Sequence, residues 1–171
     1  GCAVLIKVLE ELDNKELDFD LVANFAICEE TGLRGARIAA FQIEPDLAIA
    51  LEGTIGADMP GVEKKKRPVS LREGPAITVA DNSIIVKRSV VKSLRETAER
   101  LNVPYQYKKP TFGGTDAGAI HLSRAGVPAG VVSVPCRYIH SPHSTMFIED
   151  FEDTVSLMSD FVMNQVSKFQ D

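Results

Sequence analysis

The chain has 171 residues, of which 44% are apolar and 25% are charged, and its formal net charge is −5. This composition is typical of a globular domain and excludes a disordered tail. The negative charge argues against nucleic acid as a partner, because phosphate binding needs a basic face. The absence of an apolar run of about 18 residues argues against a membrane partner. The three cysteines lack a paired spacing, which indicates a reducing, cytoplasmic location.

Apolar spacing in the first half of the chain predicts alternating helices and strands. A helix is expected at the start, where apolar residues between Ala3 and Leu12 are dense enough that most of its surface should be covered. The next predicted elements are a strand at Asp20–Cys28, a helix at Leu33–Phe41 and a strand at Asp46–Leu51. Weaker strands are expected at Ala76–Val79 and Ser83–Val86, and the basic run from Lys64 to Arg67 is interpreted as a solvated loop.

The second half continues the alternation. It predicts a helix from Val90 to Leu101, a short strand at Tyr105–Tyr107, a loop at Gly113–Asp116, a strand at Ala129–Val134 and a last helix from about Glu149 to Val166. Asp116 is placed to cap the helix that follows its loop. Because the strands are continuously apolar, the predicted fold class is α/β, with a three-layer, mostly parallel twisted sheet and helices on both faces.

Acidic residues close two of the predicted strands. Glu29 and Glu30 follow the first strand, Glu52 follows the second, and His140 lies beyond the strand at Ala129–Val134. Strand ends of this kind meet at one edge of a sheet, where carboxylates repel one another unless a cation lies between them. Carboxylate and imidazole ligands suit Zn²⁺, Co²⁺ or Mn²⁺. Since Glu29 and Glu30 point in different directions, one can bind metal while the other activates water for amide hydrolysis.

Each of these residues has a purely structural interpretation when it is considered alone. A pair of glutamates after a strand is usually part of an exposed loop, and a histidine such as His140 in a proline-flanked loop is more often a structural hydrogen-bonding residue. Gly113 and Asp116 are compatible with a plain turn and a plain helix cap. The chemistry therefore depends on the combination of these signals.

Five segments in a fixed order resemble a known family. They are Gly1-Cys2 at the start of a helix, CEETGLRGA (28–36), LEGTIGADMPG (51–61), GGTDAGAIH (113–121) and PCRYIHSP (135–142). Together they resemble the co-catalytic metallo-aminopeptidases of the tetrahedral (TET) and glutamyl aminopeptidase type. The resemblance extends over nearly the whole chain.

The resemblance implies release of N-terminal residues from short peptides by a hydroxide that bridges two divalent ions, Zn or Co. By position, Glu29 matches the general base, Glu30 and His140 match ligands of one metal, and Glu52 matches the carboxylate of the other metal, where most of the family has Asp. It also implies that Gly114, Thr115 and Asp116 line the substrate side of the site.

The resemblance further implies that residues 1–171 are the C-terminal portion of a single metallopeptidase catalytic domain. An N-terminal catalytic segment, with a histidine ligand and a bridging aspartate, and an inserted dimerisation domain are not present. The isolated segment is therefore expected to be inactive, and the complete protein is expected to form a homo-oligomer, a dodecamer in the family. The alternatives are an N-acyl-amino-acid deacylase or carboxypeptidase on the same core, and a metal-free assembly subunit.

Overall fold

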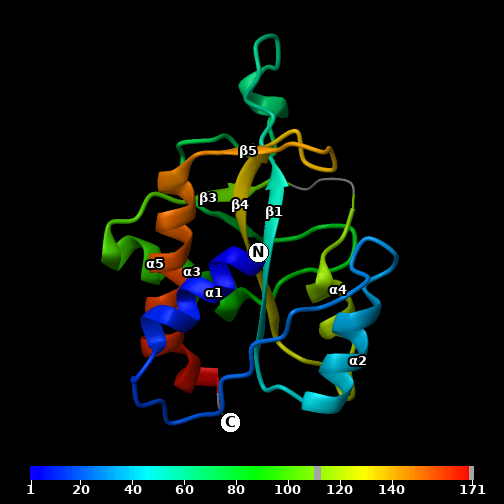
Figure 1. Ribbon diagram of the computed structural model, residues 1–171, viewed down its shortest axis with the longest axis vertical. Helices are drawn as coiled ribbons and strands as arrows, with labels where there is room; N and C mark the ends of the chain where they lie inside the picture. The colour runs from blue at the N-terminus through cyan, green and yellow to red at the C-terminus, as the bar shows by residue number, and fades with distance from the viewer. Residues whose placement is uncertain (110–112, 170–171) are drawn as a thin grey trace.

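The computed structural model describes residues 1–109 and 113–169, which form a mixed sheet between two groups of helices (Figure 1). The helices are α1 (Cys2–Leu12), α2 (Arg34–Ile43), α3 (Arg88–Leu101), α4 (Asp116–Ile120) and α5 (Ile148–Gln165), with two short 3-10 helices, η1 (Lys64–Lys66) and η2 (Val166–Phe169). The strands are β1 (Ala48–Ile55), β2 (Ala76–Thr78), β3 (Gln106–Lys108), β4 (Ala129–Arg137) and β5 (Thr145–Met146). Within the described part of the chain, every helix is too short or too polar to cross a membrane.

The sheet has the strand order β1-β4-β2-β3, with β5 paired to β4. The longest ladder is parallel and joins β1 to β4 over eight residue pairs, with Glu52 opposite Ser133. The β2–β3 ladder is also parallel, whereas β4 pairs with β2 and β5 in short antiparallel ladders. Helices α1, α3 and α5 lie on one side of the sheet, and α2 and α4 lie on the other (Figure 1). The predicted α/β class with helices on both faces is confirmed.

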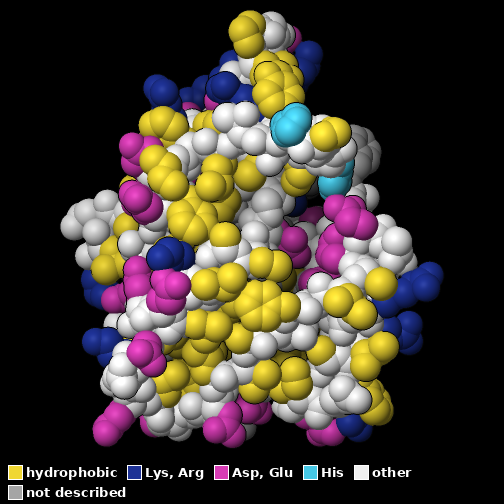
Figure 2. Space-filling view, in the orientation of Figure 1, with side chains coloured by type: hydrophobic (Ala, Val, Ile, Leu, Met, Phe, Trp, Pro, Cys, Tyr) yellow, Lys and Arg dark blue, Asp and Glu magenta, His cyan; other side chains and the backbone are white. Residues whose placement is uncertain are grey.

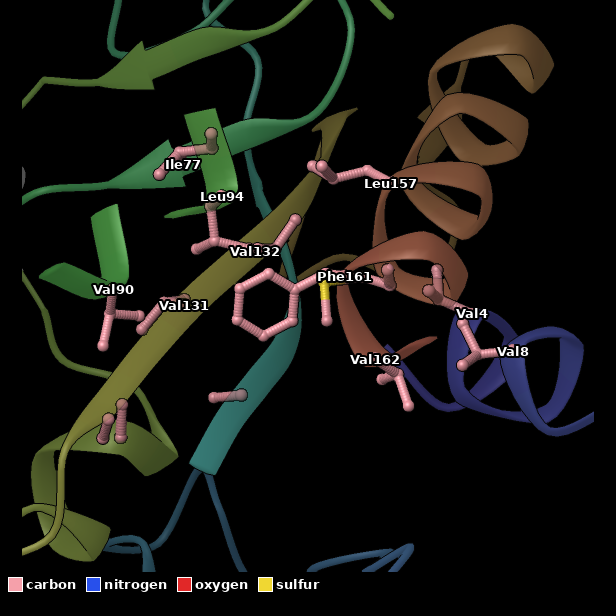
Figure 3. Packing of buried hydrophobic residues seen from close by; sticks show 14 of the residues in the cluster. Val4, Val8, Ile77, Val90, Leu94, Val131, Val132, Leu157, Phe161 and Val162 are labelled. Atoms are coloured by element: carbon pink, nitrogen blue, oxygen red, sulfur yellow. The ribbon is translucent and has the colours of Figure 1, made fainter. Parts of the chain in front are cut away.

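The core forms where α3 and α5 pack on β4 and β2. Phe161 and Leu157 of α5 are completely buried, and Leu94 of α3 packs with Ile77 and Val132 of the sheet (Figure 3). These helices carry their apolar residues at intervals of three and four positions, which places them on one face. Burial of this kind contributes about 1.5–3 kcal/mol for each large side chain. The layer therefore holds β4 in place, and β1 through its ladder with β4.

Two predictions in the first half of the chain are wrong. Within the described part of the chain, helix α1 buries one face, through Val4, Val8 and Leu12, whereas its Ile6 is 48% exposed. The stretch Asp20–Cys28 forms no strand. Its length and composition suit a strand, but within the described residues none of its backbone groups bonds to another strand, since β1 pairs only with β4. A strand forms only where a neighbouring edge accepts its hydrogen bonds.

Two smaller differences and one agreement concern the segments between the main elements. The predicted strand at Ser83–Val86 is reduced to one antiparallel bridge between Ala80 and Ile85. Thr115, and not Asp116, occupies the N-cap position of α4, so Asp116 is the first helical residue. The basic run forms the exposed helix η1 and the residue after it, which agrees with a solvated segment.

Candidate active site

Glu29 and Glu30 lie in a tight turn that leads into α2. The backbone amides of Gly32 and Leu33 both donate to the carbonyl oxygen of Glu29, at 3.1 and 2.9 Å. The amide of Gly35 donates to the carbonyl of Ile27, and a Cβ atom at position 35 would lie 2.5 Å from the Ile27 backbone. This close approach of α2 to the preceding chain explains why Gly35, the second glycine of the segment CEETGLRGA, has no side chain. It also fixes the direction in which the two glutamates leave the turn.

The sequence suggested that Glu52 follows the end of its strand, but Glu52 lies in the middle of β1. Its carboxyl group is largely buried, and burial together with the charges of Glu29 and Asp116 raises its pKa to about 7. Backbone hydrogen bonding from Asp116 acts in the opposite direction. The adjacent residue, Leu51, contacts the start of α1: a Cβ atom at Gly1 would lie 1.8 Å from the Leu51 carbonyl oxygen. Only glycine fits there, which accounts for the first residue of the first segment.

His140 lies in the turn between β4 and β5, and its Nε2 atom is 3.1 Å from Oε1 of Glu30. Both side chains are well exposed, at 64% for His140 and 71% for Glu30. The structure therefore brings together two of the predicted metal ligands, from segments 110 positions apart. Figure 2 shows acidic side chains gathered around a hollow in this face of the molecule, with a histidine at its rim.

Glu29 is partly shielded from water beside this pair. Burial raises its pKa, the negative charges of Glu30 and Asp116 raise it further, and His140 lowers it. Burial likewise raises the pKa of Asp116. Glu29, Glu30, Glu52, Asp116 and His140 thus act on one another electrostatically, and the predominance of carboxylates makes the cluster attractive to cations.

The loop before α4 forms the floor of the cluster next to Glu52. Thr115 is buried, Gly114 is exposed, and Asp116 is half-buried. Within the described part of the chain, Oδ1 of Asp116 is buried and has no hydrogen-bond partner. Buried carboxylate oxygens normally have a partner, so this atom is available to a ligand or a solvent molecule. These positions are compatible with the predicted substrate side.

The donor chemistry of the cluster fits divalent ions. A carboxylate–imidazole pair such as Glu30 and His140 suits Zn²⁺ or Co²⁺, and Glu52 supplies a further carboxylate. Within residues 1–109 and 113–169, however, no group of three His, Cys, Asp or Glu side chains is arranged to hold one ion. The described residues therefore supply part of a ligand set.

Sequence reasoning missed two supporting ion-pair and hydrogen-bond networks. The guanidinium of Arg137 donates from Nε and Nη2 to both carboxylate oxygens of Asp58, at 2.9 and 2.8 Å, directly before the turn that carries His140. Asp81 hydrogen-bonds to Thr115 in the loop before α4. The sequence signal was indirect, because Asp58, Thr115 and Arg137 fall inside three of the five segments.

Comparisons with known proteins agree with the resemblance. The profile of the family described as M42 glutamyl aminopeptidase matches residues 1–157, and the chain belongs to that family. A putative aminopeptidase of Acetivibrio thermocellus is 44% identical over 158 residues, which are 92% of this chain and 47% of the relative.

Solved structures share the fold as well as the sequence. An aminopeptidase from the archaeon Desulfurococcus kamchatkensis matches with a TM-score of 0.91 and 37% identity, covering 99% of this chain and 48% of that chain. The TET1 peptidase of Pyrococcus horikoshii, described as able to assemble into a tetrahedron or a large octahedral shell, matches with a TM-score of 0.77 and 30% identity over 93% of this chain and 46% of that chain. The chain thus spans about half the length of these proteins.

Proposed function

We propose that this chain carries part of the catalytic centre of a metal-dependent aminopeptidase, which releases N-terminal residues from short peptides. The observation that carries the proposal is the convergence of Glu29, Glu30, Glu52 and His140 from three separate segments onto one hollow. Membership in the M42 family supports the same conclusion. Residues 1–171 would form the C-terminal portion of the catalytic domain.

In this proposal, Glu30 and His140 hold one divalent ion and Glu52 holds a second, with Zn or Co as the metals. When bound, such ions supply Lewis acidity that polarises the scissile carbonyl and makes water easier to deprotonate. The remaining ligands, a histidine and a bridging aspartate, would come from a segment that precedes Gly1 in the complete protein. This assignment agrees with the incomplete ligand set among the described residues.

Glu29 would act as the general base. Its carboxylate takes a proton from the attacking water as the water oxygen bonds to the scissile carbonyl carbon, and then transfers that proton to the leaving amine nitrogen. A raised carboxylate pKa makes the group a stronger base, and partial burial beside Glu30 acts in that direction. The peptide would lie along Gly114, Thr115 and Asp116, of which Gly114 is exposed.

The relatives and structural neighbours named above are aminopeptidases and a TET peptidase. We therefore do not propose the alternatives of an N-acyl-amino-acid deacylase, a carboxypeptidase or a metal-free assembly subunit. We do propose that the complete protein is a cytoplasmic homo-oligomer, a dodecamer, as the shell-forming TET1 peptidase supports.

The test is hydrolysis by the full-length protein of a panel of aminoacyl amides and their N-acetylated counterparts, with and without a chelator. We expect turnover only of substrates with a free amino group, loss of activity with chelator, and recovery with zinc or cobalt, at about two ions per subunit. The polypeptide 1–171 alone should be inactive, because its described residues offer no three-ligand group.

No turnover by the metal-loaded full-length protein would overturn the proposed activity. Turnover of N-acetylated substrates alone would favour a deacylase. Chelator-sensitive turnover by the polypeptide 1–171 would show that the upstream ligands are unnecessary.

A further inference from the structure

The turn after β2 is held rigidly by one carboxylate. Oδ1 of Asp81 accepts hydrogen bonds from the amide of Ser83 at 2.7 Å, the hydroxyl of Ser83 at 2.7 Å and the amide of Ile84 at 3.1 Å. The backbone closes around it, since the amide of Val86 donates to the carbonyl of Val79. An Asp side chain that bonds backbone amides two and three residues ahead makes a well-defined turn.

The same turn contacts the loop before α4 at three points. The hydroxyl of Thr115 donates to Oδ2 of Asp81 at 3.3 Å, and the amide of Thr115 donates to the hydroxyl of Ser83 at 3.4 Å. The amide of Asn82 donates to the carbonyl oxygen of Gly113 at 3.1 Å. The two segments are more than 30 positions apart in the chain, so these contacts are tertiary and fix one segment relative to the other.

Shape adds to the hydrogen bonds. A Cβ atom at Gly114 would lie 2.7 Å from the Ser83 hydroxyl, and a Cβ atom at Gly118 would lie 2.2 Å from it. Ser83 therefore occupies the space that side chains at these two positions would need. The loop and the first turn of α4 can settle on Ser83 only because both positions are glycine.

The Thr115 side chain bonds to the turn after β2 and does not cap its own helix, α4. Thr115 is the N-cap residue of α4, and a threonine at an N-cap usually accepts a hydrogen bond from an amide in the first turn. Here no such bond forms, and the hydroxyl donates outward to Asp81. The contact thus joins the residue before α4 to the turn after β2, and Asp116, the next residue, lies beside Glu52.

From these contacts we infer that Asp81 and Ser83 are positioning residues, which fix the loop from Gly113 to Gly118 against Glu52 and thereby align the peptide for hydrolysis. The inference rests on the proposed function. A displacement of about 1 Å in such a loop misaligns the reacting atoms and lowers the rate, although Asp81 and Ser83 touch neither substrate nor metal.

The first experiment compares Ser83→Ala with wild type in the full-length, metal-loaded protein. The alanine keeps Cβ but loses the hydroxyl that bonds Asp81 and the Thr115 amide, and we expect kcat/KM to fall at least about 10-fold, with metal content unchanged. The matched control is Ser93→Ala, which removes a serine hydroxyl bonded to Oε1 of Gln165 where α3 packs on α5, on the other side of the sheet.

If the contact were merely structural, Ser83→Ala and Ser93→Ala would lower the melting temperature alike and leave kcat and KM per folded, metal-loaded subunit unchanged. Equal kinetics of these two variants would overturn the inference.

A second measurement does not depend on activity. In metal-free protein, Ser83→Ala should accelerate hydrogen exchange at the Thr115 amide and its neighbours in the loop, with no change in α5. Unchanged exchange in the loop would also overturn the inference. If the wild-type protein hydrolyses no aminoacyl amide, the proposed function fails, and hydrogen exchange alone decides whether Asp81 and Ser83 fix the loop.

Discussion

Glu29 and Glu52 are carboxylates that lie close to other acidic groups and are partly shielded from water. The two differ in degree: Glu52 is the more buried, and its pKa reaches about 7, whereas the pKa of Glu29 is raised by a smaller amount. Such perturbed groups are typical of functional sites, because a folded chain gains nothing from burying carboxylates together.

Glu29→Gln should separate base catalysis from metal binding. We expect kcat to fall by about 10²- to 10⁴-fold, the usual contribution of a general base, while the metal content of the full-length protein stays constant. His140→Ala should instead lower the metal content, because its Nε2 atom lies beside Glu30 in the proposed ligand pair. Elemental analysis and steady-state kinetics on the same samples make the comparison. Equal loss of metal in both variants would argue against the role of Glu29.

Glu52→Gln should change how stability depends on pH in chelator-treated protein. The pKa of Glu52 rises from 4.5 to about 7 on folding, so the folded state binds the proton more tightly. The stability from this proton is fully present below pH 4.5 and is lost as pH rises through 7. Glutamine does not titrate, so the variant does not lose this stability. At pH 8 we expect its free energy of unfolding to exceed that of the wild type by up to about 3 kcal/mol.

Urea unfolding at pH 5 and pH 8 with a chelator measures that difference, with exposed Glu16→Gln as the control. A gap between wild type and Glu52→Gln that does not widen toward pH 8 would contradict the assigned environment of Glu52. With metal in excess the wild type should be more stable than Glu52→Gln, because glutamine is a poorer metal ligand than glutamate.

At the scale of elements, the turn between β4 and β5 carries His140 in a left-handed conformation, with φ at 61° for both Tyr138 and His140. The Arg137–Asp58 pair fixes the base of this turn on the chain that follows β1. The hydroxyl of Ser141 lies 2.6 Å from the Tyr138 carbonyl oxygen, within the turn. The imidazole of His140 therefore depends on the geometry of the whole turn.

Arg137→Lys should weaken metal binding without touching a ligand. Lysine cannot make the two parallel hydrogen bonds to Asp58, and loss of such outer support typically costs about 10- to 100-fold in metal affinity. Calorimetric titration of the metal-free, full-length protein with zinc gives the constant. Arg124→Lys is the control, since Arg124 bonds Phe41 and Glu44 away from the cluster. Equal affinities in the two variants would refute the role of the pair.

Elements with strong local patterns were predictable from the sequence. Helices α3 and α5 follow from apolar residues on one face, and β4 from a continuous apolar run. The stretch Asp20–Cys28 has a strand-like composition too, but a strand needs a partner edge that its own residues do not supply. Local pattern indicates what a segment can form, and its neighbours decide whether it does.

The candidate site was predictable to a similar extent. The approach of Glu30 to His140 was expected from two strand ends, but Glu30 leaves the turn before α2, where no strand forms. The apolar run also suggested that Glu52 ends its strand, although Glu52 lies within β1. The contact of Asp81 with Thr115 was not predictable, because an Asp in a turn has the same local pattern whether or not it bonds a distant loop.

On the scale of the whole molecule, large apolar side chains remain exposed over α1, α2 and the segment before α2. They include Val22, Phe25, Ile27, Ile38 and Phe41. Figure 2 shows apolar side chains spread over the face that carries α1 and α2. Extensive exposed apolar area usually marks a surface that another polypeptide covers. This agrees with a chain that spans about half the length of its relatives.

The ladder between β1 and β4 has a consequence for the order of folding. It pairs Ala48 with Ala129 in parallel, so about 80 residues must be closed into a loop before the first of its hydrogen bonds forms. Contacts between such distant positions slow the crossing of the folding barrier. Helices α3 and α5 can gain structure locally, whereas Glu52 is set in place only when this ladder closes. The cluster of acidic side chains around Glu52 should therefore be among the last parts of the chain to become ordered during synthesis.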